Sequence, residues 1–165
     1  MELGSKARLT TLVVAVAGLV VVADQLTKWW ATRALTDGDI DLVWTLRLRL
    51  VRNHGAAFSL AGGRGGLVAI LAIAIVVALI AFGRGIDSKV GAVSLGLVLG
   101  GAVGNLLDRL FREGSGFLGG GVVDFIDLQW WPVFNVADAA IVVGVILLIW
   151  SYARRSMGRT ASGDA

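Results

Sequence analysis

The sequence predicts an all-α integral membrane protein with four transmembrane helices and a small β-rich extracytoplasmic platform. Of its 165 residues, 56% are hydrophobic, and the mean hydropathy is +0.80. Only 16% are charged, whereas a soluble domain carries about 25%. The apolar residues gather in four runs, each close to the length that crosses a hydrocarbon core about 30 Å thick. We therefore expect residues 1–165 to form a single membrane domain.

The four expected spans are residues 9–30, 66–83, 89–107 and 136–152. The alternative for the first span is a cleaved signal peptide, because a short basic head precedes its apolar run. No small-residue cleavage site follows the run, and Trp29 and Trp30 suit the aromatic belt at a membrane interface. We therefore expect the first span to remain in the protein.

The extracytoplasmic regions are expected at 31–65 and 108–135. Residues 42–51 alternate with a period of two, which predicts a half-buried strand whose apolar face lies on the bilayer or on the bundle. We predict a β-rich platform on the outer leaflet with Leu46, Leu48 and Leu50 on one face. Residues 122–128 are typical of a short buried strand. The glycine-rich 114–121 loop is a candidate flap.

Small residues mark one face of the third span. Gly96, Gly100 and Gly104 recur every four residues, a spacing that lets helices approach closely. This pattern predicts tight packing of the third span against a neighbouring helix.

The residue types that are missing narrow the chemistry. The chain has no cysteine, which excludes disulfides and a thiol nucleophile, and its one histidine, His54, argues against a zinc site. The HExxH and GxSxG motifs are also absent. The net charge of +3 lies in short basic clusters that suit membrane anchoring, so we expect no nucleic acid, metal or cofactor.

Polar residues gather at the ends of the apolar runs, on one side of the membrane. Four spans place both termini on the same side, so the end of the third span and the start of the fourth lie together opposite them. The lysine and arginine counts of the two sides are nearly equal, seven and eight, but the basic head and tail favour cytoplasmic termini. The residues on the extracytoplasmic side are Asp24, Lys28, Asn53, Asn105, Asp108, Arg109, Asp124, Asn135 and Asp138.

Asp124 and Asp138 are candidates for a catalytic pair, because ionisable groups at a membrane edge usually carry function. Two carboxylates that share one proton can activate water and polarise a carbonyl group. Structural alternatives are a turn carboxylate for Asp124 and a helix N-cap for Asp138. A functional alternative is a small proton- or cation-coupled transporter, although the second span and the inner half of the fourth contain no polar residues. On the residues alone these alternatives stay open.

Five blocks of sequence resemble the type II signal peptidases, the bacterial lipoprotein signal peptidases. The resemblance covers about residues 10–152, and its strength lies in the order of the blocks relative to the four spans. The blocks are Asp24–Lys28 (DQLTK), Asn53–Phe58 (NHGAAF), Gly100–Arg109 (GGAVGNLLDR), Val122–Phe125 (VVDF) and Phe134–Asp138 (FNVAD).

The resemblance implies an aspartic endopeptidase of the bacterial inner membrane. Such an enzyme removes the signal peptide of a prolipoprotein by cutting before a cysteine that carries a diacylglyceryl group. Asp124 and Asp138 match the family's catalytic pair. The implied supporting or substrate-binding residues are Asp24, Lys28, Asn53, Gly104, Asn105, Asp108, Arg109 and Asn135.

The implied partners are the lipid-modified signal peptide and membrane phospholipid, and we expect a monomer with its active site toward the extracytoplasmic side. A non-enzymatic alternative is a lipoprotein-binding scaffold. A scaffold would tolerate the substitution Asp124→Asn, whereas the protease would not.

Overall fold

The computed structural model describes residues 2–54, 87–114 and 118–161. The elements in these ranges are α1 (Glu2–Ala34), β1 (Ile40–Val43), β2 (Leu46–Asn53), α3 (Lys89–Phe111), β3 (Val122–Asp127) and α4 (Val136–Ala161). Within the described part of the chain, three helical segments are long and apolar enough to cross a membrane: Gly4–Ala34, Lys89–Phe111 and Val136–Arg154. These segments include the predicted spans 9–30, 89–107 and 136–152, and the predicted span 66–83 lies outside the described residues.

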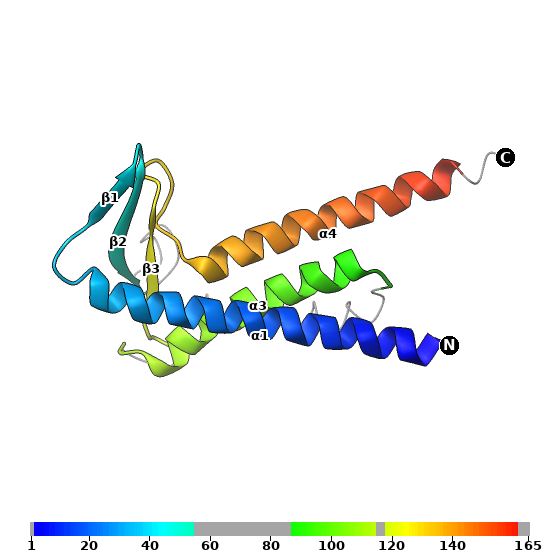
Figure 1. Ribbon diagram of the computed structural model, residues 1–165, viewed down its shortest axis with the longest axis horizontal. Coiled ribbons are helices and arrows are strands. Elements are labelled where there is room, and N and C mark those ends of the chain that lie inside the picture. The colour runs from blue at the N-terminus through cyan, green and yellow to red at the C-terminus, as the bar shows by residue number, and fades with distance from the viewer. Residues whose placement is uncertain (1, 55–86, 115–117, 162–165) are drawn as a thin grey trace.

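The helices run side by side, and the sheet lies at one end of them (Figure 1). The start of α1 and the end of α4 lie together at the opposite end. This arrangement agrees with the prediction that both termini lie on one side and the β-rich region on the other.

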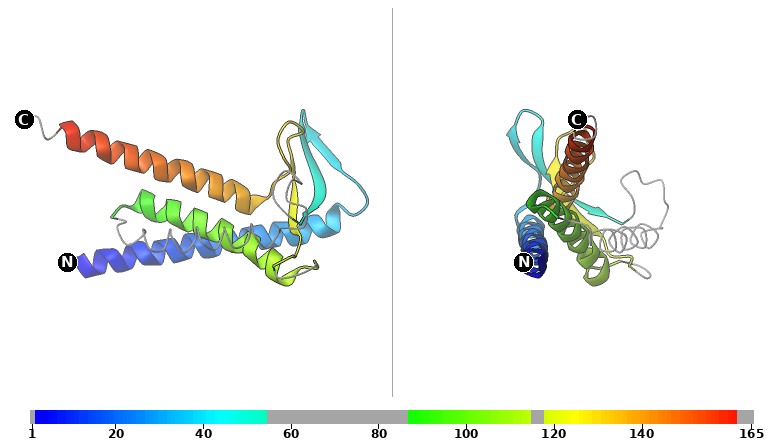
Figure 2. Two further views of the ribbon diagram at one scale, coloured as in Figure 1. Left: turned by 180° about the vertical axis from the view of Figure 1, so that it is seen from behind. Right: turned by 90° about the vertical axis from the view of Figure 1, so that its right-hand side faces the viewer.

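Helix α3 lies in the middle of the bundle and packs against both α1 and α4 (Figure 2). A Cβ atom on Gly96 would come within 2.7 Å of the Val16 Cβ atom, and one on Gly100 within 2.7 Å of the Ala17 carbonyl oxygen. Only glycine allows so close an approach of α3 to α1. The predicted packing role of the glycine face is therefore confirmed.

The sheet has three antiparallel strands in the order β1-β2-β3. The predicted single strand over 42–51 is wrong, because the chain reverses at Trp44 and Thr45 and pairs Val43 with Leu46. Trp44 has a φ of 50°, the left-handed conformation that two-residue hairpin turns require. The alternating pattern continues through the turn, so periodicity alone does not reveal the reversal. The predicted strand near residue 122 is confirmed as β3.

The sheet packs its inner face on the end of α1. Ala31, Leu35, Val123 and Phe125 form a buried cluster, and Leu48, Leu50, Ile126 and Val136 pack against it. Leu48 and Leu50 therefore face the protein core. The exposed apolar side chains of the hairpin are instead Ile40, Leu42, Val43 and Trp44.

Candidate active site

The two candidate catalytic aspartates lie at the sheet end of the bundle and share one partner. Asp124 is in β3 and is 3% exposed, and Asp138 is half-buried in the first turn of α4. The side-chain amide of Asn135 donates to Asp124 Oδ1 at 2.7 Å, and the Asn135 backbone N–H donates to Asp138 Oδ2 at 3.3 Å. A single residue thus holds both carboxylates at one site.

The same asparagine caps helix α4. Asn135 Oδ1 accepts a hydrogen bond from the Asp138 backbone N–H at 3.0 Å, while Asp138 Oδ2 accepts from the Asn135 N–H. This reciprocal pair is a capping box with the carboxylate on the third residue of the helix. The cap residue is therefore Asn135 and not Asp138, and Asp138 lies in the first turn of the helix, near the positive end of its dipole.

Strand pairing brings a second amide side chain to the site. Asp124 lies opposite Val51 on β2, so Asn53, two residues further along the same face, is its diagonal neighbour. The Asn53 side chain donates from Nδ2 to Asp124 Oδ2 at 3.1 Å. Both oxygens of Asp124 thus accept an amide hydrogen bond.

The environment of Asp124 raises its pKa to about 6. Burial is the larger cause, since it removes the water that would stabilise the charged form, and the negative charge of Asp138 adds to it. The hydrogen bonds from Asn53 and Asn135 act in the opposite direction. Asp124 therefore gains or loses its proton near pH 6.

A buried charge network holds Asp138 from the other side. Asn105 donates from Nδ2 to Asp138 Oδ1 at 2.7 Å, and Lys28 Nζ donates to Asn105 Oδ1 at 2.9 Å. Lys28 also pairs with Asp24 at 2.8 Å and Asp108 at 3.0 Å. All three ammonium hydrogens therefore have acceptors in a region that excludes water.

Asp24 and Asp108 connect this network to the backbone of neighbouring elements. Asp24 Oδ1 accepts from the Ala137 N–H at 3.0 Å, in the first turn of α4, and Asp108 Oδ2 accepts from the Val123 N–H at 3.0 Å, in β3. The network thus fixes the residue next to each of the two candidate aspartates.

Gly104 and Arg109 complete the predicted set. A Cβ atom on Gly104 would lie 2.6 Å from Asp24 Oδ2, so only glycine fits beside that carboxylate. Arg109 donates to the Asn105 carbonyl oxygen at 3.3 Å and lies close enough to Asp124 and Asp138 to interact with their charges. The structure therefore brings every predicted site residue to the same end of the bundle.

Two residues of the network were not predicted from the sequence. Arg112 donates from Nε to Asp108 Oδ1 at 2.7 Å. Gln25 donates from Nε2 to Asp108 Oδ1 at 3.2 Å and to the Gly104 carbonyl at 3.1 Å. The helical spacing of four between Asp108 and Arg112 is a signal that could have revealed this pair.

In the described ranges, no group of three or more histidine, cysteine, aspartate or glutamate side chains is arranged to hold a metal ion. Every buried side-chain nitrogen or oxygen atom of these residues has a hydrogen-bond partner. Lys28 and Arg112 pair directly with Asp24 and Asp108, whereas the amide of Asn105 lies between Lys28 and Asp138.

Fold and site together define a class of protein, an integral membrane protein with an aspartate pair where its helices meet a small sheet. A family model described as Signal peptidase (SPase) II matches residues 16–154. The chain belongs to the signal peptidase II family, whose members are aspartic proteases.

Named relatives and solved structures agree with this membership. The lipoprotein signal peptidase of Rhodococcus jostii is 49% identical over 138 residues, which cover 81% of this chain and 68% of the relative. The lipoprotein signal peptidase of Mycobacterium avium is 43% identical over 159 residues, which cover 93% of this chain and 87% of the relative. A bacterial membrane enzyme solved by the in meso method at 2.3 Å is 30% identical, with a TM-score of 0.75, and the match covers 87% of this chain and 88% of that one.

Proposed function

We propose that the chain removes the signal peptide from diacylglyceryl-modified prolipoproteins by cutting before the lipidated cysteine, with Asp124 and Asp138 as the catalytic pair. Family membership carries the reaction class. The observation that supports the pair is their shared contact with Asn135, beside a buried lysine network, at the sheet end of an apolar bundle.

The proposed mechanism uses one water and one shared proton. The ionised carboxylate removes a proton from water, and the resulting oxygen attacks the scissile carbonyl carbon while the protonated carboxyl donates a hydrogen bond to the carbonyl oxygen. The C–N bond then breaks, and the proton taken from water passes to the leaving amine. Asn135 and Asn105 hold the two carboxylates in position throughout.

We further propose four spans, 9–30, 66–83, 89–107 and 136–152, in one domain over residues 1–165 of the bacterial inner membrane. Strand β2 ends at the sheet end of the molecule, whereas α3 begins at the end that holds the start of α1. A span over 66–83 would return the chain between them. The proposed enzyme is a monomer with cytoplasmic termini, and regions 31–65 and 108–135 lie outside.

The sheet platform is proposed to rest on the outer leaflet through its hairpin tip. Trp44 is 99% exposed at the tip, and Leu42 and Val43 beside it are also exposed. Trp130 and Trp131, in the loop before α4, are exposed as well. Tryptophan favours the headgroup region of a bilayer, which supports contact of these side chains with lipid.

The transporter alternative has no support from the relatives. A proton or cation pathway needs polar groups at several depths of the membrane. Among the described helices, the buried charged side chains are Asp24, Lys28 and Asp108, which all lie in the site at the sheet end.

Incubation of the purified protein with a lipid-modified precursor peptide tests the proposed function. Cleavage directly before the lipidated cysteine, and not in the same peptide without lipid, is the expected result. The Asp124→Asn variant is the control, because it should bind the lipidated peptide without cleaving it. A scaffold would bind the lipidated peptide and leave it intact. Binding without cleavage by the wild-type protein would therefore contradict the proposed protease function.

A further inference from the structure

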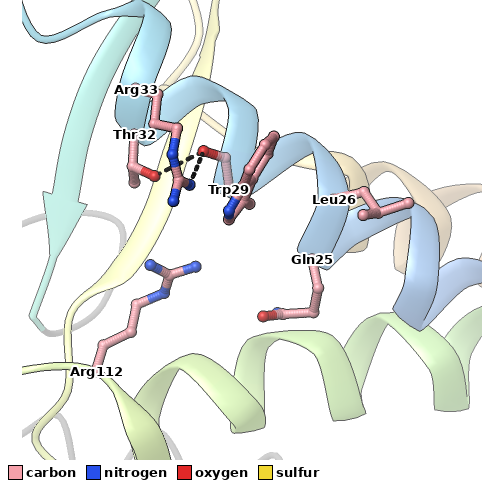
Figure 3. Close-up of a pocket in the computed structure, with 6 residues that line it drawn as sticks. All are labelled: Gln25, Leu26, Trp29, Thr32, Arg33 and Arg112. Carbon is pink, nitrogen blue, oxygen red and sulfur yellow. Dashed lines mark hydrogen bonds between the residues drawn. The ribbon is translucent and has the colours of Figure 1, made fainter.

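A cavity of about 520 Å³ lies between the outer half of α1 and the end of α3, apart from the aspartate pair, and two arginine side chains line it (Figure 3). The lining contains neither aspartate of the pair nor the asparagines that hold them. It consists of Gln25, Leu26, Trp29, Thr32, Arg33 and Arg112.

Two guanidinium groups face this cavity from opposite walls, Arg33 from α1 and Arg112 from the end of α3. Arg33 is fixed over the Trp29 ring at 3.9 Å and bonds the Trp29 carbonyl oxygen at 3.3 Å. Arg112 donates from Nε to Asp108, a carboxylate that shares Lys28 with Asp24. The lining residues include no carboxylate. The lining of the cavity therefore presents two cationic side chains, and the carboxylate that pairs with Arg112 lies outside the lining.

The lining changes from apolar to cationic along the membrane normal. Leu26, Trp29 and Arg33 lie on one face of α1, and the first and last are separated by about 10 Å along the helix axis. Trp29 marks the headgroup level, so Leu26 lies on the hydrocarbon side and Arg33 on the water side. Leu19 and Val22 extend this face deeper, and both are exposed.

We propose that this cavity binds the phosphate headgroup of an anionic phospholipid from the leaflet at the sheet end. Arg33 and Arg112 would share the phosphate oxygens, since the planar guanidinium fork matches phosphate geometry. One acyl chain would lie along the exposed apolar face of Leu19, Val22 and Leu26. This apolar track selects a lipid over free phosphate. The inference does not depend on the proposed cleavage reaction.

Native mass spectrometry of the full chain in detergent tests the proposal by titration with phosphatidylglycerol. We expect saturable binding that weakens about tenfold in Arg33→Gln, because a charge-assisted bond to phosphate is lost. Arg49→Gln is the matched control, since Arg49 is a half-exposed arginine of the sheet outside the cavity, and it should bind as the wild type does. Equal affinity of Arg33→Gln and Arg49→Gln would overturn the site.

Further arms identify the ligand and guard against misfolding. Inorganic phosphate and a short-chain phosphatidylglycerol should each compete much less well than the long-chain lipid, and equal competition by phosphate would overturn the lipid assignment. Leu26→Gln should weaken the long-chain lipid more than the short-chain one. Arg112→Gln should weaken binding too, but this substitution also removes a hydrogen bond to Asp108 and could prevent folding. If that variant does not fold, the results for Arg33→Gln and Leu26→Gln test the proposal.

Discussion

At the scale of single residues, the site depends on amides that connect charged groups. Asn135 contacts both aspartates, and Asn105 connects Asp138 to Lys28. An amide can donate to a carboxylate without adding a charge, so it orients the aspartates without forcing both of them to be ionised. Lysine in either position would instead hold both carboxylates ionised.

The first prediction concerns the aspartate pair as a unit. Asp124→Asn and Asp138→Asn should each remove most of the cleavage activity, and the double variant should lose little more, because groups that act together are strongly non-additive. Cleavage of the lipidated peptide by the folded variants measures this. Activity should also survive chelators. Near wild-type cleavage by folded Asp124→Asn, or restoration by zinc after chelation, would contradict the pair mechanism.

The second prediction follows from the pKa of Asp124, which burial raises to about 6. The pair needs one proton, and Asp124 loses it as the pH rises through this pKa. Consequently kcat/KM should fall on the alkaline side of about pH 6. Asn53→Ala removes a hydrogen bond that favours the ionised form, so the pKa of Asp124 should rise and the alkaline limb should move to higher pH. The control Arg49→Gln should keep the wild-type pH profile. If the alkaline limb of kcat/KM were also unchanged in Asn53→Ala, Asp124 would not be the titrating group.

The third prediction tests the steric role of Gly104. In Gly104→Ala the new methyl group would displace the Asp24 carboxylate that caps the Ala137 N–H. We expect a loss of stability of about 1–3 kcal/mol, typical of overpacking, together with reduced cleavage. Thermal unfolding in detergent measures the first effect. Gly18→Ala is the control, because a Cβ atom there meets nothing within 4 Å, and it should leave both properties intact.

At the scale of elements, the β1–β2 hairpin contacts the rest of the described chain through β2. Leu48 and Leu50 pack against the cluster at the end of α1, and β2 brings Asn53 to Asp124. The hairpin tip extends away from this contact and carries exposed apolar side chains. One end of the hairpin thus contacts the site through Asn53, and the other end exposes apolar side chains that could contact lipid.

The fourth prediction places the tip of the hairpin in the bilayer interface. The chain has no cysteine, so Trp44→Cys provides a single site for a nitroxide label. In vesicles this label should be accessible to oxygen and shielded from a water-soluble nickel complex. A label at Arg49, half-exposed elsewhere on the same sheet, should show the opposite. A water-like response at position 44 would mean that the platform does not touch the leaflet.

At the scale of the whole molecule, α3 determines how the bundle and the site are joined. Its glycine face admits α1 closely, and its last turns supply Asn105, Asp108 and Arg109 to the site. The outer faces of α1 and α4 remain largely apolar and exposed, as they would be in contact with lipid. The buried charges are collected where the helices leave the membrane, which limits the cost of removing them from water.

The fifth prediction is the orientation of the molecule. The basic head and tail favour cytoplasmic termini, and the site lies at the opposite end of the helices. A reporter fused after Tyr152 should therefore behave as cytoplasmic, and one inserted near Gly63 as extracytoplasmic. The reverse pattern would invert the orientation and leave the chemistry of the site unchanged.

The apolar runs, the glycine face and the polar residues that share one side of the bundle can be read from the sequence. These features depend on local composition and on which end of each run a residue lies at, so they can be predicted without knowing how the chain packs. Three described helices are long and apolar enough to be the corresponding spans. The glycine spacing predicted close packing because a helix repeats its faces every three to four residues.

The pairing of groups that lie far apart in the sequence depends on the tertiary structure. The contacts of Asp124 with Asn53 and Asn135, and of Lys28 with Asp108, form only because packing brings different elements together. Hydrophobic periodicity records burial and not chain direction, so a tight hairpin looks like one strand. A buried carboxylate takes the donors that packing presents to it, and these come from residues distant in sequence as often as from neighbours.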